Sequence, residues 1–124
     1  MLAVAFLMAL AAQSLDAFDD ANLALTQCGF AAYRHSTQGD QTLNQFSRFL
    51  TSRCAVQIAR MRAAIIDVET RRGKSSAAAA SSADALIAQF RAQFAGDYAR
   101  RAETEAQVRA LERALREEGK SNAQ

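Results

Sequence analysis

Residues 43–68, LNQFSRFLTSRCAVQIARMRAAIIDV, decide the fold class of this chain. Their apolar side chains recur in steps of three or four residues, which places them along one side of a helix. No proline or glycine interrupts the segment. The sequence therefore predicts one helix from about residue 41 to 72. Its apolar stripe consists of Leu43, Phe46, Leu50, Cys54, Ile58, Met61, Ile65 and Val68.

The preceding segment predicts another helix, from about residue 16 to 36, with Ser14 as its N-cap. Gly39 is expected to take the left-handed conformation that closes this helix. Either Asp40 or Thr42 is then expected to cap the helix that follows. The apolar side of the first helix consists of Leu15, Phe18, Leu25, Cys28 and Ala32.

The two cysteines test this arrangement. Antiparallel helices joined by a tight turn pair residues whose numbers have a constant sum. A turn centred near residue 41 places Cys28 opposite Cys54, because 28 and 54 add up to twice 41. Both cysteines lie on an apolar stripe, which favours a structural bridge over a catalytic dithiol. The sequence thus predicts a disulfide-clamped antiparallel helical hairpin over residues 13–72, although in a reducing compartment the cysteines would be ordinary buried thiols.

The N-terminus resembles an export signal. Residues 1–12 form an unbroken apolar run that is shorter than a membrane span, and Ala9-Leu10-Ala11 offers a cleavage site of the small-x-small type. No lysine or arginine precedes Arg34, so a buried first helix of a cytosolic domain is the alternative. Together with the even cysteine count, this run predicts a signal peptide over 1–12 and a periplasmic or secreted protein of the cell envelope.

The C-terminal part predicts a third helix. Residues 73–83 are rich in serine and alanine, and they predict either a flexible linker or a continuation of helix, with a break favoured at Gly73. Residues 84–124 predict a long amphipathic helix that is capped by Ser81 or Ser82, ends at Gly119 and has a frayed tail.

The apolar seam of this helix becomes narrow after Gly96, where charged residues predominate. Such a helix is typical of one that pairs with another helix. We therefore expect it to bind a protein partner or a second copy of the chain. The residues expected to make this contact are Tyr98, Val108, Leu111 and Leu115.

Charge gives one alternative. The net charge of +2 is too small to indicate nucleic-acid binding, but residues 34–74 carry eight basic side chains against three acidic ones. Counted at 100° per residue, Arg53, Arg60 and Arg71 fall within about 20° of one another. These arginines could bind an anionic ligand or make weak contact with a membrane surface.

No grouping of residues predicts catalysis. Gly73-Lys74-Ser75 resembles the end of a phosphate-binding loop, but the glycine required five positions earlier is Val68. His35 is the sole histidine and is expected to lie exposed near the hairpin turn. We expect no metal, no cofactor and no enzymatic activity. The sequence predicts an all-α exported protein, with a helical hairpin and a long C-terminal helix, that acts as a binding, scaffold or accessory subunit through its helix faces.

Overall fold

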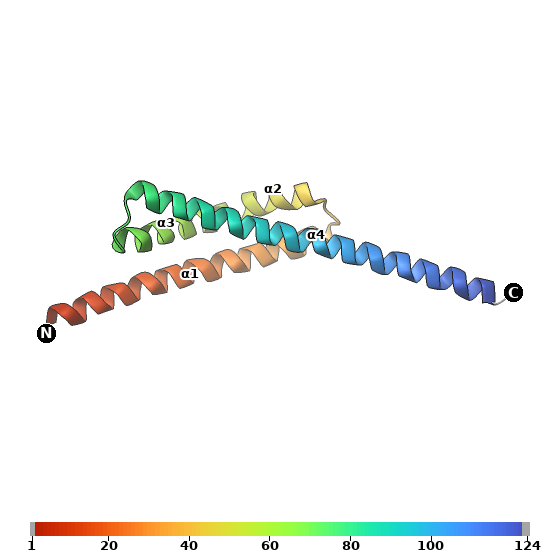
Figure 1. Ribbon diagram of the computed structural model, residues 1–124, viewed down its shortest axis with the longest axis horizontal. Helices are drawn as coiled ribbons and strands as arrows, with labels where there is room; N and C mark the ends of the chain where they lie inside the picture. The colour runs from red at the N-terminus through yellow and green to blue at the C-terminus, as the bar shows by residue number, and fades with distance from the viewer. Residues whose placement is uncertain (1, 123–124) are drawn as a thin grey trace.

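The computed structural model describes the backbone of residues 2–122 and the side chains of residues 16–122 (Figure 1). Within these residues the only regular elements are helices, so the predicted all-α class is confirmed. Helices α1 and α4 are long, and α2 and α3 together run back along α1 (Figure 1). The helix bounds are Leu2–Gln38 for α1, Leu43–Arg53 for α2, Ala55–Arg71 for α3 and Ser76–Asn122 for α4.

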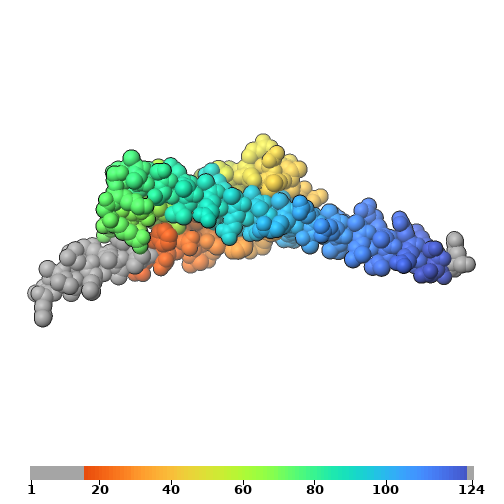
Figure 2. Space-filling model, in the orientation of Figure 1, coloured from red at the N-terminus to blue at the C-terminus, as the bar shows by residue number. Residues whose placement is uncertain are grey.

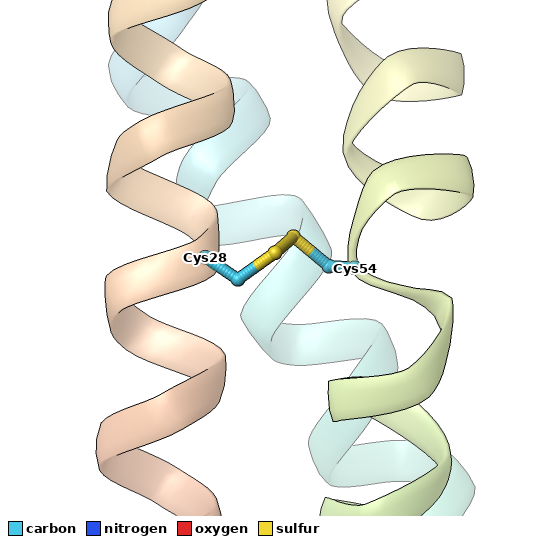
Figure 3. The surroundings of a disulfide bond; sticks show 2 residues. All are labelled: Cys28 and Cys54. Carbon is cyan, nitrogen blue, oxygen red and sulfur yellow. A yellow bond between two sulfur atoms is a disulfide. The ribbon is translucent and has the colours of Figure 1, made fainter.

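The predicted disulfide is present. Cys28 of α1 and Cys54 are bonded, with their Cα atoms 5.8 Å apart (Figure 3). The Cys54 side chain is fully buried, and the bridge joins the C-terminal half of α1 to the residue between α2 and α3. The hairpin prediction is therefore confirmed. A covalent bridge of this kind is typical of proteins outside the reducing cytosol.

The prediction of one continuous second helix is wrong at a single residue. The helix is interrupted at Cys54, which ends α2 and begins α3. Hydrogen bonds from Cys54 N–H to the Leu50 carbonyl and from Ile58 N–H to the Cys54 carbonyl join Cys54 to the helices on both sides. The apolar stripe consequently keeps its phase across the break, and it is buried at Phe46, Leu50, Cys54, Ile58, Met61 and Ile65.

The turn between α1 and α2 differs from the prediction in one residue. Asp40, not Gly39, takes the positive φ, at 53°. Asp tolerates this conformation better than most residues. Thr42 caps α2 as predicted: its hydroxyl accepts from the Gln45 N–H at 3.2 Å, and the Gln45 side chain accepts from the Thr42 N–H at 2.9 Å.

The segment 73–83 is divided between turn and helix. Gly73, with φ at 96°, ends the hairpin as expected. Helix α4 then begins at Ser76, so the alanine-rich residues are helical and not a linker. Its first turn is capped by Ser75, whose hydroxyl accepts from the Ala78 N–H at 3.2 Å. Ser81 and Ser82 lie inside the helix and are not caps.

The outer boundaries of the long helices also extend beyond the predictions. Helix α1 passes through residue 14, so Ser14 is not an N-cap. Helix α4 passes through Gly119 and ends at Asn122. A single glycine costs a helix about 1 kcal/mol, which neighbouring helix formers offset. The side chains of residues 1–12 lie outside the described set, so the signal peptide stays a prediction.

The core lies where α3 packs between α1 and α4. Its aromatic centre is close to the first turn: the rings of Phe46 and Tyr98 stack with centroids 4.4 Å apart, and Tyr33 packs edge-on against both. From this crossing, α1 and α4 diverge toward the α3–α4 turn, and α4 continues alone in the opposite direction (Figure 1). We call residues 16–100 the body and residues 101–122 the arm.

Candidate docking surface

The arm has few contacts with the rest of the described chain. Every residue from 101 to 122 is exposed, and Figure 2 shows the arm as a single rod beyond the body. Val108, Leu111 and Leu115 are exposed by 49%, 62% and 58%, respectively. We call these three side chains the seam, because their spacing of three and four places them on one side of the helix. An exposed apolar row of this kind marks an interaction surface.

Tyr98 does not belong to this surface, and its assignment to partner binding is wrong. Its side chain is only 5% exposed, because it packs at the point where α4 crosses the first turn. Its hydroxyl donates a hydrogen bond that is shared between the carbonyl oxygens of Gln41 and Ser36. Burial raises the pKa of the Tyr98 phenol. Tyr98 therefore holds α4 to the hairpin.

The body contains an apolar groove on the side where α1 and α4 diverge. Met61 and Ile65 of α3, Phe18 of α1, and Leu86 and Phe90 of α4 line a space of about 240 Å³. Leu86 is 46% exposed. A smaller hollow of about 140 Å³ adjoins it near Val68 and shares three of its lining residues. The groove is thus a mainly apolar surface depression along α4, with polar side chains at its edges.

Gly29 of α1 allows α4 to approach α1 closely at Phe94. A Cβ atom at position 29 would lie 2.7 Å from Cζ of Phe94. On one side of this contact the two helices stay together, with Tyr33 packed against Tyr98, and on the other side they separate toward the α3–α4 turn. The pattern of apolar residues alone gave no sign of this role.

The three arginines predicted to bind an anionic ligand lie on the returning chain of the hairpin. Arg53 lies at the end of α2, whereas Arg60 and Arg71 lie in α3. Arg71 forms an ion pair with Asp67 at 3.2 Å, and the Arg53 guanidinium lies over the Phe49 ring at 5.8 Å. Of these three arginines, Arg60 alone has neither an ion pair nor a cation–π contact with the described residues. Their binding of an anionic ligand stays a prediction.

Other chemistry is equally sparse in the described region. His35 is exposed near the first turn, as predicted, and its ring stacks on Phe49 with centroids 4.6 Å apart. No group of three or more metal-ligating side chains gathers among residues 16–122. Across the described helices, no stretch has both the length and the hydropathy to cross a membrane.

The comparisons with known proteins give no assignment. No protein-family model matches the chain, and neither a curated protein nor a solved structure is significantly similar to it. The seam and the groove are consequently the features on which a functional proposal depends. Sequence reasoning found the seam but missed the groove, because Phe18 and Leu86 read as core residues when only their own helix is considered.

Proposed function

We propose that this chain is a non-enzymatic binding or scaffold protein of the cell envelope, which docks a helix against the seam of its arm. The observation that supports this most strongly is the exposure of Val108, Leu111 and Leu115 on a helix that no other described element covers. Three large apolar side chains at helical spacing present the pattern by which helices recognise one another.

The body has the properties that a scaffold requires. The disulfide and the packed aromatic centre hold the first three helices, and Tyr98 anchors α4 to them. The arm is an extension of the same continuous helix, so a partner docked on it would be held in a fixed direction relative to the body. The proposed envelope location is supported by the disulfide and by the apolar residues 1–12.

Site-specific photo-crosslinking in the native envelope tests this proposal. A photoreactive residue at position 111 lies on the seam, whereas one at position 113 lies on the opposite side of the same helix turn. We expect position 111 to give a crosslinked product whose mass spectrum maps the partner to a helical segment, and position 113 to give much less. Equal products from both positions, or none from position 111, would contradict the proposal.

A further inference from the structure

The seam of the arm is the end of a longer stripe along α4. At 100° per residue, Leu86 and Phe90 in the body fall on the same side of the helix as Val108, Leu111 and Leu115 in the arm. Between them, the same side carries polar residues in the steps of three and four that are typical of a coiled coil. The full stripe is Leu86, Phe90, Gln93, Asp97, Arg100, Arg101, Thr104, Val108, Leu111 and Leu115.

This stripe is symmetric about its midpoint. When a second α4 is laid antiparallel on the first, each facing pair has residue numbers that add up to 201. Leu86 faces Leu115 of the copy, 93 faces 108, and 97 faces 104. Phe90 faces Leu111 in the same register. Apolar side chains therefore meet in the two outermost pairs, Gln93 faces Val108, and polar side chains meet in the middle.

We propose that the arm docks on a second copy of this chain, with the α4 helices antiparallel, and that the seam of each copy fills the groove of the other. This inference rests on the proposed helix docking and names its partner. The seam cannot reach the groove of its own copy, because both lie on one continuous helix, about 33 Å apart between residues 89 and 111. A partner copy supplies the leucine side chains that the open groove accommodates.

Charge at the midpoint separates the two directions by one contact. Asp97 of one copy would lie within about one helical turn of Arg100 and Arg101 of the other. In the single chain, Asp97 pairs with Arg100 and Arg101 pairs with Glu105, so contacts across the interface would exchange these exposed ion pairs for new ones. Both directions set arginine beside arginine, since Arg100 faces Arg101 of the copy in the antiparallel register, but only a parallel pair would also set Asp97 beside Asp97, which destabilises the pairing.

The surface is long enough for a specific dimer. The stripe runs from residue 86 to residue 115, about 44 Å along the helix. The antiparallel direction also places the two bodies at opposite ends of the paired helices, so each arm lies beside the body of the other copy. The assembly closes on itself by two-fold symmetry, as most homodimers do.

Light scattering of the oxidised full chain over a concentration series tests the inference. We expect a dimer whose Kd rises at least about tenfold in Leu111→Glu and in Leu86→Glu, because each places an unpaired carboxylate in the apolar contact. Ala110→Glu makes the same change on the opposite side of the arm and should leave the Kd unaltered. Circular dichroism should show unchanged helix content in all three variants, since these positions are exposed.

The direction of pairing has its own measurement. With the native disulfide intact, a spin label at position 113 should report about 38 Å between copies along the helix axis, whereas a parallel pair would bring the labels to within about 20 Å. The short distance, or a chain that remains a monomer at all concentrations, would overturn the inference. A monomer that still gives the crosslink from position 111 to another protein would overturn only the dimer and leave the proposed function standing.

Discussion

The body and the arm use the same kind of helix in opposite ways. In the body, apolar side chains face other helices of the same chain, and Phe46 and Leu50 are almost completely buried. In the arm, side chains of the same kind face solvent along a helix that continues without interruption from the body. The difference shows that the described body covers its own apolar side chains, whereas the seam is available for a contact outside the fold.

The largest expected effect contrasts a core residue with a seam residue. Phe46→Ala removes a fully buried ring that stacks on Tyr98, and it should lower the free energy of unfolding by about 3–5 kcal/mol. Leu111→Ala should change it by less than about 0.5 kcal/mol in dilute protein, because that side chain is 62% exposed. Urea unfolding measures both, and comparable losses would contradict the division into body and arm.

The disulfide gives the next largest effect. Replacing Cys28 and Cys54 together with serine should destabilise the body by about 3 kcal/mol, because the unfolded chain loses a constraint on a loop of 26 residues. Reduction should lower the free energy of unfolding of the native protein by a similar amount, and with it the thermal midpoint. The thermal midpoint of the double variant should not respond to reductant. If reductant has no effect on the native protein, the bridge does not hold the hairpin.

The Tyr98 hydroxyl should contribute about 1 kcal/mol through its hydrogen bond, and this contribution should depend on pH. Because burial raises the pKa of Tyr98 above its ordinary value of 10, the folded state favours the neutral phenol. The contribution is complete below pH 10 and is lost as the pH rises through the raised pKa. Tyr98→Phe should be less stable at pH 7 and should lack this alkaline decline, as a comparison of thermal midpoints at pH 7 and pH 11 would show.

The smallest effect concerns the turn between α3 and α4. The Lys74 ammonium lies 2.6 Å from the Glu69 carboxylate and lowers its pKa below the ordinary value of 4.5. The pair therefore contributes stability above pH 4.5, and this contribution is lost as the pH falls through the lowered pKa. Glu69→Gln should be slightly less stable than the native protein at pH 7 and equal to it at pH 2. A difference that persists at pH 2 would assign the effect to packing.

Much of the body could be predicted because two segments each have a regular spacing of apolar residues. The stripes of α1 and of residues 43–68 independently brought Cys28 and Cys54 together, and the disulfide confirms both. The break at Cys54 could not be predicted, because no glycine or proline marks it. Ser75 was missed as the cap of α4 because Ser81 and Ser82 offered the same chemistry nearer to the bulky apolar residues.

The candidate site was predicted less completely. The seam at Val108, Leu111 and Leu115 follows from spacing alone, and its exposure agrees with that expectation. Tyr98 was misassigned because the buried side of α4 adjoins the stripe, so that one-dimensional spacing does not separate them. The groove requires three helices to be placed in space, and a pattern within one helix cannot reveal it.

Hydrogen exchange of the backbone amides tests the contrast between body and arm most directly. An unsupported helix opens more readily than a packed one, so amides of residues 104–118 should exchange much faster than those of Phe46 and Leu50 in Leu111→Glu. In concentrated native protein, the docked arm should become strongly protected. Arm amides that exchange as slowly as those of Phe46 and Leu50 in Leu111→Glu would contradict the contrast between body and arm, and equal arm exchange in the native protein and in Leu111→Glu would contradict the binding of a second copy.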